Sequence, residues 1–82
     1  MTYRKVVSRQ AEKYLRQQHG RVLQRLQEAI DGLPMLGDIK KLKGSNDYRI
    51  RIGDMRIIFA MDHTERTVYV KTIDNRKDIY KK

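Results

Sequence analysis

The chain has 82 residues, and we expect a single domain over residues 1–82 because chains divide into several cores only at much greater lengths. It carries 19 Lys and Arg against 10 Asp and Glu, and the resulting net charge of +9 favours a polyanionic partner. It contains no cysteine, which excludes disulfides and thiolate chemistry, and its apolar runs are too short for a signal peptide or a membrane span, so we expect a cytoplasmic protein with no membrane partner.

The N-terminal part of the chain predicts a strand followed by two helices. Strand-forming residues gather in residues 3–8, and Ser8 is suited to cap a helix that follows it. Apolar residues at steps of three and four predict helices over residues 9–18 and 22–33, the second of which ends before Pro34. The short break between the helices indicates a helical hairpin packed on one face of a sheet.

A basic segment follows the second helix. Residues 34–47 show no periodicity, and they contain Lys40, Lys41 and Lys43 among glycines and polar residues. We expect a loop here, and long loops in compact domains are more often functional than idle. The composition is equally typical of a solvated surface loop.

The last third of the chain predicts an antiparallel sheet. Three strands are indicated, over residues 48–52, 55–62 and 67–73. Gly53 and Asp54 form a two-residue turn between the first two strands, which places Ile52 opposite Met55.

This register separates apolar from cationic side chains. One face is wholly apolar and must meet the helices, while the other holds Arg49, Arg51 and Arg56. Arg51 and Arg56 become direct neighbours across the strands, which destabilises a sheet unless an anion lies between them. The register therefore indicates an anion site. The alternative is that these arginines only decorate the surface, paired with acidic neighbours at positions 54, 62 or 74.

The third strand extends the same two faces. Pairing Met61 with Val68 and Phe59 with Val70 keeps both valines on the apolar face and places Tyr69, Lys71 and Ile73 on the arginine face. This pairing sets Ile73 opposite Arg56 and brings Arg76 to the same region. Tyr80 follows a few residues later, where it either serves the site or packs on the sheet edge.

Such a face predicts phosphate chemistry. Arginine forks bind phosphate oxygens and stabilise charge that develops on a pentavalent phosphorus, and a nearby tyrosine can stack on a base. We therefore expect cleavage of RNA without a metal or other cofactor, by attack of the 2′-hydroxyl to give a 2′,3′-cyclic phosphate. A two-metal nuclease needs clustered carboxylates, and the two histidines lack ligand spacing.

The order of elements and three segments resemble the RelE/ParE toxin superfamily. The segments are DIKKLKG at 38–44, YRIRIGDMRIIF at 48–59 and IDNRKDIY at 73–80. The resemblance implies an α+β fold of order β-α-α-β-β-β, with the helical hairpin on one face of a mainly antiparallel sheet. It also implies a toxin of a type II toxin–antitoxin pair, which in the RelE branch cleaves mRNA in the ribosomal A site. Its partner would be a RelB-like or other DNA-binding antitoxin.

The resemblance also implies roles for individual residues. Arg49 and Arg51 match strand residues that hold and activate the substrate, Arg56 matches the arginine that stabilises the transition state, Arg76 matches a second phosphate-binding arginine, and Tyr80 matches the terminal tyrosine that orients the substrate. We assign RNA binding to the lysines around this set, Lys40, Lys41, Lys43, Lys71 and Lys77.

The chain departs from the family pattern in two places. Nucleolytic relatives often have lysine where Arg49 and Arg51 stand, and arginine cannot readily act as a base. Asp74 and Asn75 replace a Gly-His pair of many relatives. The general base is therefore unassigned, which implies a weakened nuclease or one that depends on the ribosome. The alternatives are a ParE-like inhibitor of DNA gyrase and a basic RNA-binding module without chemistry.

Overall fold

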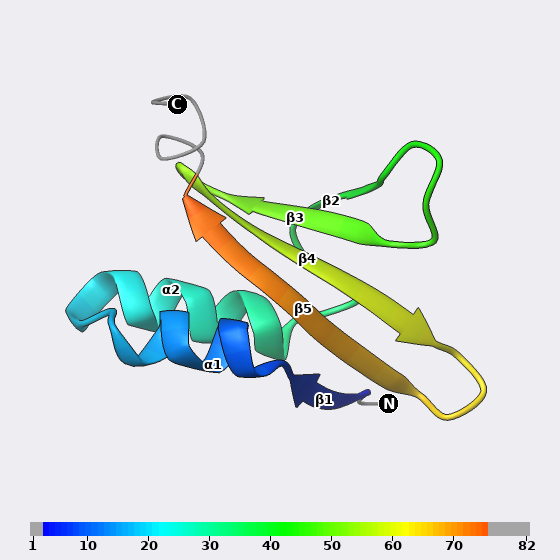
Figure 1. The fold of residues 1–82 in the computed structure, drawn as a ribbon, viewed down its shortest axis with the longest axis horizontal. Helices are drawn as coiled ribbons and strands as arrows, with labels where there is room; N and C mark the ends of the chain where they lie inside the picture. Colours follow the sequence, from blue (N-terminus) through cyan, green and yellow to red (C-terminus); the bar gives the residue numbers. More distant parts are fainter. Residues whose placement is uncertain (1–2, 76–82) are drawn as a thin grey trace.

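The computed structural model describes residues 3–75, which form a five-stranded sheet covered on one face by two helices (Figure 1). In chain order the elements are β1 (Arg4–Val7), α1 (Arg9–Arg16), α2 (Gly20–Asp31), β2 (Asp38–Lys41), β3 (Tyr48–Ile52), β4 (Met55–Asp62) and β5 (Thr67–Asn75). The strand order is β1-β5-β4-β3-β2, with β1 parallel to β5 and all other neighbours antiparallel. The predicted α+β fold, with a helical hairpin on a mainly antiparallel sheet, is confirmed. Neither helix in the described residues is long and apolar enough to cross a membrane.

Ser8 joins the first strand to the first helix. Its Oγ accepts a hydrogen bond from the Ala11 backbone N–H at 3.1 Å, which satisfies one of the free donors at the start of α1. The same hydroxyl donates to the Lys71 backbone oxygen at 2.6 Å. The predicted cap is therefore confirmed, and it also fixes the start of α1 to β5.

The core lies between the helices and the sheet face that meets them. Buried apolar side chains alternate along most of β3, β4 and β5, so one face of the sheet is buried. The other face carries the arginines together with the half-buried Ile58 and Ala60. The buried apolar residues are Ala11, Leu26, Ile30, Leu33, Ile50, Ile52, Met55, Ile57, Phe59, Val68, Val70 and Ile73. The β3–β4 register is the predicted one, with Ile52 opposite Met55 and Arg51 opposite Arg56.

The pairing of β4 with β5 corrects one prediction. The pairs Met61–Val68 and Phe59–Val70 are as expected, but a bulge between Ile58 and Phe59 shifts the register beyond them. Ile73, predicted on the arginine face, is fully buried opposite Ile57. Burying a large aliphatic side chain, rather than leaving it exposed to water, stabilises the folded state by about 1.5–3 kcal/mol. This gain is enough to favour an irregular register.

The basic segment before β3 is also more ordered than the predicted loop. Strand β2 pairs with β3 there, with Ile39 opposite Ile50. The backbone enters β2 at Gly37, whose φ of +112° is one that L-residues rarely adopt, and a Cβ at this position would lie 2.4 Å from the Ile50 Cδ1. The remaining residues 42–47 connect the two strands of this hairpin.

The end of β5 is held by a glutamine from α1. Strand β1 ends at Val7, and beyond this residue the Gln10 side-chain amide forms hydrogen bonds with the backbone of β5. Its Nε2 donates to the Ile73 backbone oxygen at 3.0 Å, while its Oε1 accepts from the Ile73 backbone N–H at 3.1 Å. The side chain thus replaces one residue of a missing neighbouring strand.

We expect Gln10→Ala to lower the free energy of unfolding by about 1–3 kcal/mol, because two part-buried backbone groups lose their partner. Urea denaturation followed by circular dichroism measures the change. Gln24→Ala on the exposed face of α2 is the matched control and should lie within about 0.5 kcal/mol of the wild type. Equal losses of unfolding free energy in the two variants would contradict a stabilising role for the Gln10 hydrogen bonds.

Candidate functional site

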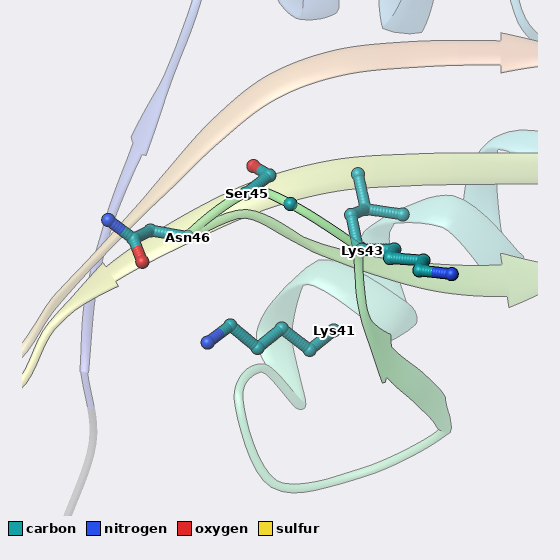
Figure 2. A pocket seen from close by; sticks show the side chains of 6 residues that line it. Lys41, Lys43, Ser45 and Asn46 are labelled. Atoms are coloured by element: carbon teal, nitrogen blue, oxygen red, sulfur yellow. The ribbon is translucent and has the colours of Figure 1, made fainter.

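The predicted lysine track divides between two places. Lys41 and Lys43 line an open cavity of about 690 Å³ on the β2–β3 connection, together with Leu42, Gly44, Ser45 and Asn46. Figure 2 shows the two lysine side chains extending in different directions from this connection. Lys40 instead lies opposite Arg49 in the β2–β3 register, on the polar face of the sheet. The structure therefore brings Lys40, but not its two neighbours, to the arginine face.

Four charged residues cross that face in one row, which we call the central row. The register pairs Asp38 with Arg51, Arg51 with Arg56, and Arg56 with Asp74, so the row runs from β2 to β5. Two cations stand side by side at its middle and one carboxylate stands at each end. The predicted pair of like charges is present, and the prediction of an anion site rests on it.

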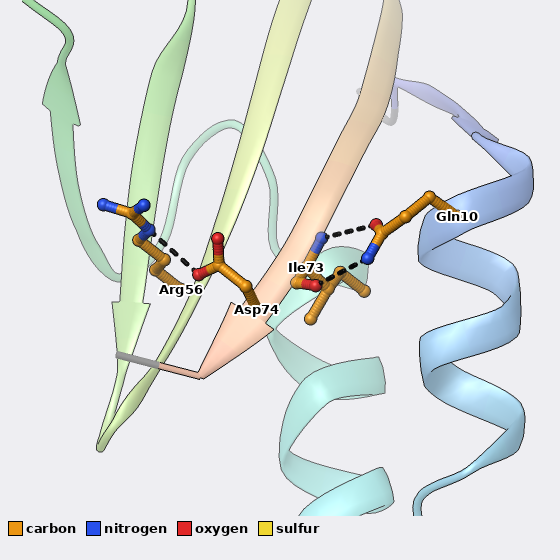
Figure 3. Close-up of polar contacts among 4 residues, drawn as sticks. All are labelled: Gln10, Arg56, Ile73 and Asp74. Atoms are coloured by element: carbon orange, nitrogen blue, oxygen red, sulfur yellow. Dashed lines mark hydrogen bonds and ion pairs between the residues drawn. The ribbon is translucent and has the colours of Figure 1, made fainter. Parts of the chain in front are cut away.

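Arg56 is held from one side of its guanidinium group. Its Nε donates to the Asp74 Oδ1 at 2.9 Å, and the two side chains are 36% and 29% exposed. Figure 3 shows the contact from Nε to Asp74 and one terminal nitrogen of Arg56 on the far side of the guanidinium group. Pairing of the arginines with acidic residues, position 74 among them, was the alternative interpretation of the sequence. The contact with Asp74 uses the Nε–H of Arg56, and donors on the terminal nitrogens remain for an anion.

Arg51 is the exposed member of the pair. Among residues 3–75 no hydrogen bond or ion pair of its guanidinium group is present. An anion between Arg51 and Arg56 can accept hydrogen bonds from both side chains, and it would relieve their repulsion.

Arg49 is enclosed rather than presented to solvent. Only 13% of its side chain is exposed, and its Nη1 lies 3.6 Å from the Asp38 Oδ2 and 3.3 Å from the Asp38 backbone oxygen. It shares the face with Arg51 but already has a carboxylate partner. Of the three strand arginines, Arg49 is therefore the one most committed to holding the sheet together.

Lys71 lies at the bulge of β5 and reaches across to the start of β3. Its Nζ is 2.9 and 3.1 Å from the two carboxylate oxygens of Asp47. Asp38 and Asp47 were both missed by the sequence reasoning. Asp47 alternates with Arg49 and Arg51 and could have been found from that spacing, whereas the position of Asp38 depends on recognising β2.

Three predicted site residues, Arg76, Lys77 and Tyr80, lie outside the described residues. Their assignment stays a prediction, although the expected placement of Ile73 opposite Arg56, from which the reach of Arg76 was argued, is wrong. Asp74 occupies that place. Within the described part of the chain, no three His, Asp or Glu side chains gather in a way that would hold a metal ion.

Comparisons with known proteins find likenesses to RelE toxins. No protein-family model matches the chain. A 45-residue stretch, 54% of this chain, is 40% identical to a curated protein of Methanocaldococcus jannaschii whose name marks it as a candidate toxin, RelE1, and the match spans half the length of that relative.

Solved structures match over almost the whole chain. The archaeal RelE–RelB complex from Pyrococcus horikoshii aligns with a TM-score of 0.77 and 26% identity, over 93% of this chain and 97% of the other. The RelB–RelE complex from Methanococcus jannaschii gives 0.71 and 29%, over 92% and 94%. The isolated RelE toxin of E. coli gives 0.75 at 19% identity, over 98% and 93%, which is a likeness of fold alone.

Proposed function

By its fold and these likenesses the chain belongs to the RelE-like toxin superfamily, and on that premise we propose that it is a type II toxin that cleaves mRNA. The proposed activity is a metal-free endoribonuclease that acts in the ribosomal A site and is held silent by an antitoxin. The observation that carries the proposal is the side-by-side pair of Arg51 and Arg56 on the sheet face opposite the helices, with donors left for an anion.

The proposed reaction is a transesterification within the RNA. The 2′-hydroxyl loses its proton and its oxygen forms a bond to the adjacent phosphorus. The bond from phosphorus to the 5′-oxygen breaks, and this oxygen takes up a proton, so the products are a 2′,3′-cyclic phosphate and a 5′-hydroxyl. Negative charge builds on the phosphoryl oxygens, where the N–H groups of Arg51 and Arg56 would stabilise it. Neither guanidinium takes up the 2′-hydroxyl proton, because arginine stays charged at neutral pH. We assign no base to this chain and infer that the ribosomal complex completes the site.

The other predicted residues take supporting roles in this proposal. Arg49 holds the β2–β3 edge of the face, Arg76 adds a second phosphate contact, and Tyr80 orients the substrate. The lysines would contact the RNA backbone in two places, with Lys40 and Lys71 near the arginine face and Lys41 and Lys43 on the β2–β3 connection. Lys77, outside the described residues, keeps its predicted role in RNA binding. RNA affinity should then fall by about 0.7 log unit for each phosphate contact over a tenfold rise in salt.

Inducible expression in growing cells tests the function, with the 5′ ends of mRNA mapped after growth stops. Cuts that fall inside translated codons would support the proposal, and their loss when translation initiation is blocked would support dependence on the ribosome. Growth arrest with intact messages and broken DNA would favour a gyrase inhibitor. Binding of RNA with neither cuts nor arrest would favour a module without chemistry.

The proposed antitoxin predicts a change in stability. Two solved relatives are complexes with RelB. This chain exposes Met35 and Leu36 between α2 and β2, and the two residues are 71% and 68% exposed. A partner that binds only the folded state at 100 times its Kd stabilises that state by about 2.7 kcal/mol. We therefore expect the product of a neighbouring gene to raise the melting temperature. An unchanged melting temperature at saturating concentration would count against that partner.

A further inference from the structure

The contact between Arg56 and Asp74 is directional. It is a single hydrogen bond from Nε to Oδ1 at 2.9 Å, and among residues 3–75 it is the one hydrogen bond or ion pair that the Arg56 side chain makes. A guanidinium group carries five N–H donors, of which Nε supplies one. The four donors on the terminal nitrogens make no hydrogen bond within residues 3–75. One of them is parallel to Nε–H, and the other three point to edges of the guanidinium group away from Asp74.

The carboxylate that makes this contact is itself held in place. Asp74 follows Ile73, whose side chain is fully buried and whose backbone N–H and C=O both bond to the Gln10 amide. A continuous set of contacts therefore runs from α1 through Gln10 and Ile73 to Asp74 and Arg56, as Figure 3 shows. The bulge in β5 is what sets Asp74, instead of Ile73, opposite Arg56.

Fixing Nε has a consequence for anion binding. An arginine on a sheet surface samples many rotamers, and ordering it costs free energy when it binds a ligand. A side chain already held at Nε loses less of this freedom, and its terminal nitrogens keep one orientation relative to Arg51 on the neighbouring strand.

We propose that Asp74 is a positioning residue, which holds Arg56 by Nε so that its terminal nitrogens face the phosphate between Arg56 and Arg51. The inference rests on the proposed function and goes beyond it, because it gives a role to a carboxylate within a cationic face. Asp74 acts through Arg56 and does not contact the reacting atoms.

Two variants separate hydrogen bonding from charge. Asp74→Ala removes the acceptor, whereas Asp74→Asn keeps an amide oxygen that can accept from Nε, and both variants remove the same negative charge. Glu12→Ala is the control, since it removes one carboxylate and its ion pair with Arg16 on an exposed part of α1. All three variants raise the net charge from +9 to +10.

The first measurement concerns the protein without RNA. In ¹⁵N-labelled protein, the Arg56 Nε–H resonance should be slow to exchange with water in the wild type, Glu12→Ala and Asp74→Asn, and fast in Asp74→Ala. Titration with inorganic phosphate should shift the terminal nitrogens of Arg56 in the wild type and bind more weakly to Asp74→Ala. A fast-exchanging Nε–H in the wild type would overturn the proposal.

The second measurement is the rate of mRNA cleavage on programmed ribosomes under single-turnover conditions. Asp74→Ala should cleave about 10- to 100-fold more slowly at saturating ribosome concentration, with half-saturation changed less than about threefold. Asp74→Asn should stay within about fivefold of the wild type. A faster Asp74→Ala would show that the carboxylate only screens Arg56, and equal losses in both variants would show that its charge or basicity matters; either result overturns the inference.

The two proposals can fail separately. A wild type that cleaves no message would refute the proposed function, and with it the positioning role of Asp74 in cleavage, while the Nε–H measurement would still report the contact. Cleavage by the wild type that is undiminished in Asp74→Ala would refute the inference alone.

Discussion

Arg56→Ala is expected to abolish growth arrest and to lower the rate of mRNA cleavage about 10²- to 10³-fold, with little change in the fold. Removal of one donor that stabilises transition-state charge has an effect of this size. The side chain is on the polar face of β4, is one-third exposed, and has one hydrogen-bonded partner among residues 3–75, so the core keeps all of its contacts. Colony formation after induction and cleavage on programmed ribosomes measure the loss.

Two companion variants make the Arg56 result specific. Arg16→Ala removes an exposed arginine from α1 with the same change in net charge, and it should leave growth arrest intact. Arg56→Lys keeps the charge but lacks the planar fork, so we expect an intermediate rate. Loss of the far-ultraviolet circular dichroism signal in Arg56→Ala would show that the residue is structural, and normal toxicity would remove it from the site.

The arginine pair was predictable because two local signals agree on it. Gly53 and Asp54 impose a two-residue turn, and the strict alternation of Tyr48, Ile50 and Ile52 with arginines leaves one register that buries the apolar set. A one-residue slip would turn every apolar side chain of β3 to water. Turn and burial thus determine the same pairing, and the placement of Arg51 opposite Arg56 follows from it.

The partners of the arginines were less predictable because they depend on irregular features. Strand β2 has one apolar residue, Ile39, among charged neighbours, so neither periodicity nor composition distinguishes it from a loop. The bulge of β5 depends on tertiary burial of Ile73, which a uniform alternation cannot represent. These two features bring Asp38 and Asp74 to the central row. The sequence therefore predicted the two arginines of the row but not both of the carboxylates that flank them.

Phe59→Ala is expected to have the largest effect on stability, about 3–5 kcal/mol. The ring is fully buried beside the bulge of β5 and stacks on Tyr48, with centroids 5.8 Å apart and planes at 22°. A domain of 82 residues has only about 4–12 kcal/mol of stability in total, so this single loss can unfold much of the population.

Urea denaturation of Phe59→Ala, Phe59→Leu and Tyr69→Ala separates the lost packing from other effects. Leucine keeps most of the apolar volume and should cost less than alanine. Tyr69 lies on the more exposed face of β5, and its loss should change stability by less than about 1 kcal/mol. Equal urea midpoints for Phe59→Ala and Tyr69→Ala would contradict this assignment of the core.

Phe59 is on the opposite face from Arg56, so Phe59→Ala should lose toxicity only in proportion to its unfolded fraction. An antitoxin that binds the folded state should restore the fold of this variant. Arg56→Ala should lose toxicity while it is folded, so comparing the two variants separates a loss of stability from a loss of chemistry.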